Sequence, residues 1–287
     1  MKFAFVKGHL ADTFPVGACC AAMGVSRSGY YAWRDRPASA RATRRAELAA
    51  KVEAVHAQNR GVYGSPRVWA ALVASGEVVS QNTVAGVMRE HQVRARASRK
   101  FVPRTTDSRH GKPVAKNLLD RRFDADRPDR KWAADVTYVP TDEGWLYLAG
   151  VIDLCSRKLV GWSMADHLRT DLVSDALRMA VAGRDPGAGL LHHSDRGVQY
   201  ASDEYQRLLA EHGMTCSMSG KGDCWDNAVM ESFWGTLKTV LVNHEHYETR
   251  EQARASIFEY VEVFYNRQRL HSSLGYLSPE QFEAGLN

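Results

Sequence analysis

The chain has 287 residues, of which 44% are hydrophobic and 25% charged, and 38 basic against 33 acidic side chains give a formal net charge of +5. This composition excludes collagen, low-complexity disorder and a disulfide-rich miniprotein, and the length allows two domains with a sizeable core. No apolar run reaches the ~18 residues of a membrane span, and the five cysteines form no C-x-x-C pair. We therefore expect a reduced, cytoplasmic protein without a membrane partner.

The charge is divided unevenly along the chain. Residues 1–130 hold 24 Lys and Arg against 11 Asp and Glu, whereas residues 131–287 hold 14 against 22. The basic half favours a polyanion partner, because Lys and Arg release the counterions of nucleic-acid phosphates. The acidic half would repel the same polyanion unless its carboxylates hold metal ions. A protein that merely has unevenly charged, solvated faces remains the alternative on this observation alone.

Residues 1–36 predict a first segment like a helix-turn-helix. Phe14–Val16 opens a short helix, Gly24 ends it, and Ser26 is placed to cap a second helix over Arg27–Trp33. Any hairpin of two helices gives a similar pattern, so the pattern alone does not specify DNA binding.

Residues 37–100 predict a second such segment. Helices are expected over 41–60, Arg67–Ser75 and Gln81–His91, with Ser65 and Ser80 as N-caps. The third helix starts with Gln81, Asn82 and Thr83, and in a recognition helix such residues face base edges. A plain three-helix bundle is the alternative interpretation.

A basic linker is expected over residues 101–130. From Arg94 to Arg130 the sequence has twelve basic residues, five acidic ones and three prolines, and no clear helical or strand period. We interpret it as a segment that follows a phosphate backbone, with a merely solvated linker as the alternative. The basic side chains expected on DNA in this half are Arg67, Arg94, Arg96, Arg99 and Lys100.

From Lys131 the apolar pattern changes to that of strands. Three hairpin-connected strands are followed by alternating helices and strands, which predicts an α/β layer with a mixed sheet over 131–242 and a helical extension over 243–287. Strands are expected over Trp132–Val139, Trp145–Leu154, Lys158–Met164, Leu190–His193 and Met214–Met218. Helices are expected over Asp171–Val181, capped by Thr170, and over Tyr200–His212 and Trp225–Val242.

Three acidic residues of this α/β region are candidate metal-binding or catalytic residues. Asp135 lies inside the first strand, Asp195 ends a short strand, and Glu231 lies within the last helix. Strand ends of α/β sheets are common ligand sites, and oxygen ligands suit Mg²⁺. Two ions ~4 Å apart stabilise both the attacking and the leaving oxygen of a phosphoryl displacement. For any one carboxylate alone, a surface or ion-paired residue is the alternative.

The flanks of these carboxylates form an ordered set of motifs, and 35 residues separate Asp195 from Glu231. The motifs are Phe14–Val16 with Gly24–Trp33, Tyr63–Val68, Trp132–Tyr138, His193–Tyr200, Asp226–Phe233 and Tyr265–Pro279. In this order they resemble the retroviral-integrase-like transposases of bacterial insertion sequences. Over nearly its whole length the chain is similar to the second-reading-frame product of the group that makes its active protein by frameshifting.

This resemblance implies a ribonuclease-H-like domain in which Asp135, Asp195 and Glu231 bind Mg²⁺ or Mn²⁺ and catalyse two steps. Hydrolysis at an element end would free a 3′-hydroxyl, which would then attack a second phosphodiester. The implied partners are double-stranded DNA, the upstream reading-frame protein or a fusion with it, and further copies of the chain. Such a protein would work in the cytoplasm, associated with the nucleoid.

Lys238 lies seven residues after Glu231, so both side chains project from nearly one helix face. A cation beside a metal-binding carboxylate suits a DNA phosphate between them, although an exposed helix lysine is the alternative. His192 and His193 are interpreted as hydrogen-bonded scaffold rather than as catalytic groups. Two other functions stay open: a non-catalytic DNA-binding regulator or accessory subunit, and a stand-alone ribonuclease-H-like nuclease or resolvase.

Overall fold

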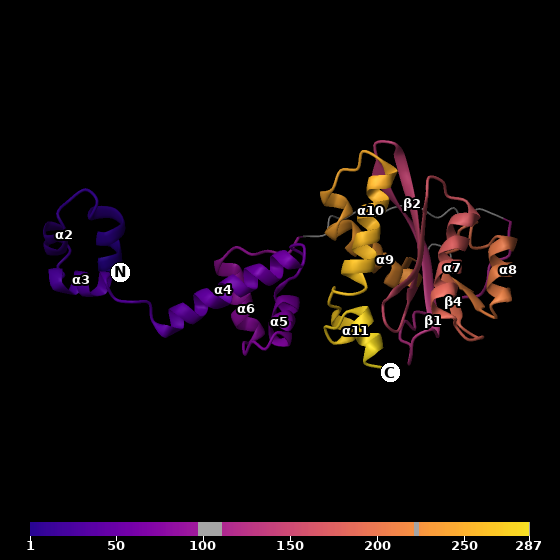
Figure 1. Ribbon diagram of the computed structural model, residues 1–287, viewed down its shortest axis with the longest axis horizontal. Coiled ribbons are helices and arrows are strands. Elements are labelled where there is room, and N and C mark those ends of the chain that lie inside the picture. The colour runs from indigo at the N-terminus through magenta and orange to yellow at the C-terminus, as the bar shows by residue number, and fades with distance from the viewer. Residues whose placement is uncertain (97–110, 221–223, 287) are drawn as a thin grey trace.

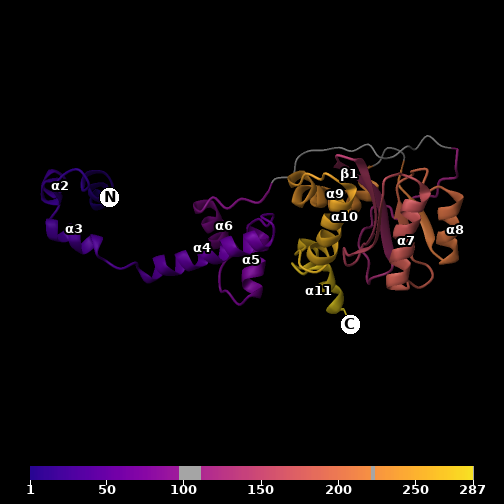
Figure 2. The same ribbon diagram turned by 45° about the horizontal axis from the view of Figure 1, so that its top comes forward.

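The computed structural model describes residues 1–96, 111–220 and 224–286. Two helical units are followed along the long axis by a layered α/β unit, and both views show this order (Figure 1, Figure 2). Arg99 and Lys100 lie outside the described residues. Within the described part of the chain, no helix is both long and apolar enough to cross a bilayer.

The first unit is a small helical bundle. Its elements are α1 (Lys2–Phe5), the π-helix η1 (Val6–Leu10), α2 (Val16–Ala22) and α3 (Arg27–Arg34). The Ser26 hydroxyl accepts a hydrogen bond from the Gly29 N–H at 3.0 Å, so the predicted N-cap is confirmed. The core contains Val6, Tyr30 and the buried thiols of Cys19 and Cys20.

The second unit has three helices, α4 (Ala40–Gln58), α5 (Ser65–Ala74) and α6 (Gln81–Glu90), around a core that includes Val52 and Leu72. Ser80 caps α6 as predicted, because its hydroxyl accepts from the Thr83 N–H. The prediction that Ser65 caps α5 is wrong: the helix already begins at Ser65, and Gly64 is its N-cap. The Gly64 carbonyl itself accepts the N–H groups of Arg67 and Val68.

The third unit is built on a five-stranded mixed sheet, as predicted. Its strands are β1 (Lys131–Thr141), β2 (Gly144–Asp153), β3 (Leu159–Ala165), β4 (Leu191–Ser194) and β5 (Thr215–Met218), in the order β3-β2-β1-β4-β5. The first three form an antiparallel meander, whereas β4 and β5 run parallel to β1. Strand β1 is buried on both faces, because helices cover both sides of the sheet.

The two faces of the sheet carry different helices (Figure 1). Helices α7 (Thr170–Arg184) and α8 (Asp203–Glu211) cover one face. The other face packs against α9 (Ala228–Val240), α10 (Arg250–Glu259) and the π-helix η4 (Tyr260–Tyr265). Short 3₁₀-helices η2 (Cys224–Asn227), η3 (Val242–His244) and η5 (Ser272–Leu274) and helix α11 (Pro279–Ala284) complete this side.

One helix cap in this unit differs from prediction. Helix α7 begins at Thr170 with Arg169 as its N-cap, so the prediction that Thr170 is the cap is wrong. The Asp171 carboxylate in the first turn accepts the Leu172 N–H at 3.0 Å instead. This acidic side chain also lies at the positive end of the helix dipole.

Part of the segment expected to be a linker is anchored to the sheet. Leu119 is 1% exposed within the main core. The N–H groups of Leu118 and Leu119 both donate to the Ser217 hydroxyl of β5. Residues near Leu119 are therefore part of the α/β unit and not a free linker, because the Leu119 side chain packs in its core and two main-chain N–H groups bind its β5 strand.

Candidate active site

Asp135 lies on the face of β1 that packs against α9. It is half-buried, and its partner across the antiparallel ladder is Gly150. The Trp234 indole N–H of α9 donates to Asp135 Oδ2 at 3.0 Å. Loss of solvent raises the pKa of Asp135 to about 8, and the charges of Asp195 and Glu231 act in the same direction.

Asp195 stands beside Asp135 because their strands are paired in parallel. Ala133 of β1 pairs with His193 of β4; Asp135 lies two residues further along β1, and Asp195 directly follows the end of β4. The Gly197 N–H donates to Asp195 Oδ1 at 2.8 Å and fixes one of its oxygens. The two acidic groups are thus close together near the C-terminal end of β4, where their negative charges repel each other.

Glu231 approaches from the first turn of α9. It is exposed, and partial burial raises the pKa of its carboxyl. Lys238, two turns later, places its ammonium 5.1 Å from the centre of the Tyr138 ring. Burial lowers the pKa of Lys238, while the Asp135 charge acts against that shift. The lysine and the two carboxylates of Asp135 and Glu231 therefore share one side of α9.

The neighbouring histidines are scaffold, in agreement with the interpretation from the sequence. Both are buried. His193 hydrogen-bonds the hydroxyls of Ser217 and Ser219, and His192 hydrogen-bonds the Tyr205 hydroxyl at 3.0 Å. Burial lowers the pKa of His192 to about 3 and that of His193 to about 4, so both rings are neutral near pH 7. They hold β4 against β5 and α8.

The carboxylate oxygens of Asp135, Asp195 and Glu231 are suitable ligands for a hard divalent cation, although the three side chains are not tightly grouped. Within residues 1–96, 111–220 and 224–286, no three His, Cys, Asp or Glu side chains are grouped tightly enough to form a metal centre. Asp135 and Asp195 nevertheless form a charge-repelling pair of oxygen donors, and the exposed Glu231 acts on Asp135 electrostatically. A divalent cation relieves that repulsion, because it supplies the opposite charge that these carboxylates lack.

The side chains predicted to bind DNA are spread over two units. Gln81 and Asn82 are exposed at the start of α6, whereas the Thr83 hydroxyl lies 2.9 Å from that of Ser80. Arg94 is exposed beyond the end of α6. Gln81–Thr83 and Arg94 thus lie at opposite ends of α6, and no contact between them and the three carboxylates is found among the described residues.

Two further predicted DNA residues lie where the helical and α/β units meet. Arg96 is exposed and donates to the Val240 carbonyl at the end of α9, at 3.3 Å. Arg67 is half-buried, and its Nε donates to the Leu270 carbonyl at 2.9 Å. Tyr63 joins the same contact, because its hydroxyl accepts the Leu270 N–H at 2.7 Å.

Trp234 and Gly150 are site residues that the sequence reasoning missed. Trp234 follows Glu231 by three positions, which puts both near one helix face, and this spacing was the available signal. A Cβ on Gly150 would lie 3.0 Å from the Trp234 ring, so the glycine leaves the space that the indole fills. No feature of the sequence around Gly150 indicates that role.

Comparisons with known proteins agree with this architecture. Models described as integrase core domain match residues 125–224 and 212–279, and one described as HTH-like domain matches residues 43–101. The transposase InsF for insertion sequence IS3A of Escherichia coli K12 is 45% identical over 285 residues, which cover 99% of this chain and 98% of that protein. The chain belongs to the InsF family of insertion-sequence transposases. It is accordingly a DNA transposase with an integrase core.

Other similar proteins extend the comparison. The insertion element IS600 uncharacterized 31 kDa protein of Shigella sonnei is 43% identical to this transposase over 92% of the chain and 96% of that protein. Among solved structures, the catalytic core domain of HTLV-2 integrase in complex with magnesium has a TM-score of 0.43 at 16% identity. That match covers 55% of this transposase and 99% of the viral domain.

Proposed function

We propose that Asp135, Asp195 and Glu231 are the metal-binding catalytic carboxylates of this transposase and hold two Mg²⁺ or Mn²⁺ ions. The observation that carries the proposal is the convergence of Asp135 and Asp195 from adjacent parallel strands, with Glu231 electrostatically coupled from α9. Such ions activate water and stabilise charge on the attacking and leaving oxygens of a phosphodiester.

The reaction has two steps at one site. Water attacks the phosphorus at the element end, the P–O3′ bond breaks, and a 3′-hydroxyl and a 5′-phosphate result. That hydroxyl then attacks a phosphodiester of the target strand; a new P–O bond to the element end forms, the target P–O3′ bond breaks, and the target is left with a free 3′-hydroxyl. The nucleophiles are water and DNA, so no covalent bond to the protein forms.

The neighbouring side chains position these groups. Trp234 donates to Asp135 Oδ2 and holds that carboxylate in place, and the Gly197 N–H does the same for Asp195 Oδ1. Lys238 brings a positive charge to the same side of α9, where it binds a DNA phosphate next to Glu231. In this arrangement the α/β unit can bind DNA once metal ions neutralise the carboxylates of Asp135, Asp195 and Glu231.

The basic units bind DNA outside the cleavage point. Gln81, Asn82 and Thr83 start α6, the last helix of the segment that matches the HTH-like model, and we assign them to base edges. Arg94 and Arg96, with Arg99 and Lys100, are assigned to backbone phosphates. Replacing Arg94 by Gln should weaken DNA binding at low salt and make the log–log salt dependence less steep by roughly one.

We further propose that the transposase acts as an oligomer, together with the product of an upstream reading frame or fused to it. Joining two element ends requires two active sites, which favours a second copy of the chain. Light scattering with and without duplex element ends tests the oligomer, and the DNA sequence immediately upstream tests for an overlapping frame. A monomer on two joined ends, or no such frame, contradicts the respective proposal.

The deciding experiment is strand joining in Mn²⁺. The substrate is an element-end duplex with a free 3′-hydroxyl, and a supercoiled plasmid is the target. Wild type should yield joined product, and Asp135→Asn, Asp195→Asn or Glu231→Gln should lower the rate by about 10³ or more, because several kcal/mol of charge stabilisation are lost. Glu211→Gln is the matched control, since Glu211 is an exposed acidic residue at the end of α8. Wild-type rates in any one triad variant would remove that residue from the site.

A further inference from the structure

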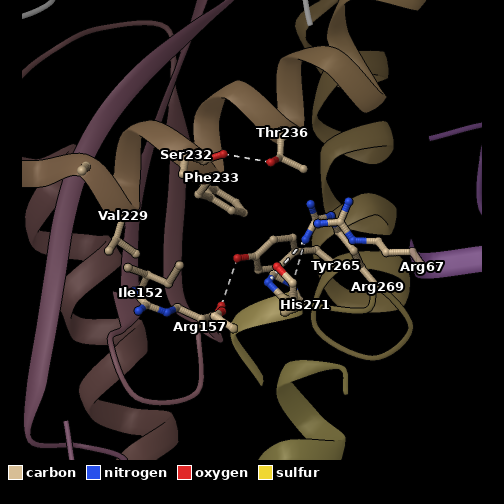
Figure 3. A pocket seen from close by; sticks show the side chains of 13 residues that line it. Arg67, Ile152, Arg157, Val229, Ser232, Phe233, Thr236, Tyr265, Arg269 and His271 are labelled. Carbon is tan, nitrogen blue, oxygen red and sulfur yellow. Dashed lines mark hydrogen bonds between the residues drawn. The ribbon is translucent and has the colours of Figure 1, made fainter. Parts of the chain in front are cut away.

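A cavity of about 280 Å³ lies on the other side of α9 from the carboxylates. Ser232 and Thr236 of α9 line it, whereas Glu231 and Lys238 point away by roughly half a helical turn. Its remaining lining comes from α5, from Ile152 of β2 and the turn before β3, and from Tyr265 of η4 and the segment after it (Figure 3). Four stretches of sequence that are far apart in the chain therefore meet around one cavity.

Three arginines line this cavity, and no acidic residue does. Arg67 of α5 and Arg269 of the segment after η4 lie together at one end of the cavity, whereas the guanidinium of Arg157, from the turn before β3, lies at the other end beside Ile152 (Figure 3). Across the described ranges, none of the three guanidinium groups has a carboxylate within 4.0 Å. For comparison, the buried Arg184 is paired with both Asp129 and Glu283.

The three arginines are buried to different depths, and Arg67 and Arg269 repel each other. Arg269 is only 8% exposed, and its guanidinium contacts the His271 ring nitrogens at 3.1 and 3.3 Å. Burial lowers the pKa of Arg67, and the nearby charge of Arg269 lowers it further. Burial lowers the pKa of His271 to about 2, and all three arginines add to that shift, so the ring is neutral. The charges of Asp153 and Asp124 act on Arg157 from beyond contact distance. The buried positive charge of Arg67 and Arg269, with no carboxylate in contact, is costly unless an anion fills the cavity.

We propose that this cavity binds a phosphate group of the DNA backbone and that the bound phosphate locks the HTH-like unit onto the catalytic unit. Arginine forks match phosphate oxygens, and hydroxyls at the mouth add further donors. Ser232, Ser272 and Ser273 are exposed there. The cavity volume lies just below the usual range for small-molecule pockets, which suits a phosphate and its attached sugar rather than a larger ligand.

A bound phosphate would join the two units because Arg67 and Arg269 belong to different ones. Arg67 belongs to α5 and already donates to the Leu270 carbonyl, while Arg269 belongs to the segment that packs against the sheet. Arg67 and Arg269 repel each other across the boundary between the two units. A phosphate bound between them would attract both guanidinium groups and so hold the units together. The proposal rests on the proposed function only in taking DNA, rather than free phosphate, as the source of the group.

The first test measures inorganic phosphate binding by thermal shift of the full chain, with sodium chloride at matched ionic strength as reference. Wild type should be stabilised, and Arg67→Gln and Arg157→Gln should bind phosphate about tenfold more weakly, since each loses a charged hydrogen-bond donor. Arg207→Gln is the matched control, because Arg207 is exposed on α8, on the opposite face of the sheet. These two half-buried arginines are preferred to Arg269, whose removal would endanger folding.

The second test measures duplex DNA binding against salt for the same proteins. Each pocket variant should reduce the log–log slope by roughly 0.9, and Arg207→Gln should not. Equal phosphate stabilisation of all four proteins, or of none, overturns the pocket. Weaker phosphate binding with unchanged DNA slopes shows that free phosphate is the ligand and overturns the DNA assignment. Glu231→Gln should bind phosphate like wild type, because Glu231 does not line the cavity. The phosphate test can therefore succeed or fail independently of the proposed catalytic role of the carboxylates.

Discussion

Helix α7 packs very closely on the sheet at Gly161 of β3. A Cβ built on it would lie 2.2 Å from the Ala176 carbonyl oxygen and 2.7 Å from both the N and the Cβ of Ala180. Carbon and carbonyl oxygen normally approach no closer than about 3.3 Å. Replacing Gly161 by Ala therefore requires α7 to withdraw by about 1 Å along its contact with β3.

The cost of that withdrawal is large, because backbone atoms cannot turn aside as a flexible side chain can. Overpacked cores typically lose 1–3 kcal/mol, and a gap of up to about 1 Å also forfeits a quarter to a half of each dispersion contact. Buried Leu172, Ala176 and Leu177 of α7 share this interface with the sheet. We expect Gly161→Ala to lower the free energy of unfolding by about 3 kcal/mol or more.

Equilibrium urea unfolding followed by circular dichroism checks this value. With a slope of about 1–3 kcal/mol per molar urea, the midpoint of the α/β unit should fall by at least roughly 1 M. Gly183→Ala is the control in the same helix, since nothing lies within 4 Å of its added Cβ. It should stabilise by about 0.5–1 kcal/mol. A Gly161→Ala protein within 0.5 kcal/mol of wild type refutes the steric reasoning.

Three further substitutions test other contacts. Trp234→Phe keeps an aromatic ring but removes the N–H that supports Asp135, so strand joining in Mn²⁺ should slow by about tenfold or more; an unchanged rate denies that support. Burial raises the pKa of Glu283, but hydrogen bonds from Arg184 outweigh it and lower the pKa below the ordinary 4.5. The stability advantage of wild type over Glu283→Gln should therefore be complete above pH 4.5 and shrink as the pH falls below it; an advantage equal at pH 3 and pH 7 contradicts the pairing. Tyr63→Phe removes the hydroxyl that accepts the main-chain N–H of Leu270, and hydrogen exchange of that N–H should speed up, as expected for a loss of about 1–3 kcal/mol. Unchanged exchange would show that this contact does not hold the HTH-like unit on the α/β unit.

The order of elements was predictable because it follows from local patterns. The meander of β1 to β3 and the helices that follow come from apolar alternation and from polar caps such as Ser26 and Ser80, and these signals lie within a few residues of the elements that they define. The caps assigned to Ser65 and Thr170 failed because the backbone carbonyl of Gly64 and the Asp171 carboxylate take those N–H groups.

The candidate site was only partly predictable, because its partners meet through the fold. The three acidic positions could be found from their flanking motifs, which are local. The hydrogen bond from Trp234 to Asp135 joins residues 99 positions apart, and Arg67 meets Leu270 across 203. No pattern within one segment encodes such contacts, and the anchoring of Leu119 on the sheet escaped prediction for the same reason.

The pairing of Gly150 with Asp135 has a consequence for how mutational scans of this transposase should be interpreted. The indole that supports the carboxylate occupies the volume that a side chain at position 150 would take. Even alanine there, which adds no charge and removes no donor, should displace the indole and act like an active-site lesion. The absence of a side chain at position 150 is thus a requirement of the candidate site. A mutational scan that ranks positions by the chemistry of their side chains would overlook Gly150.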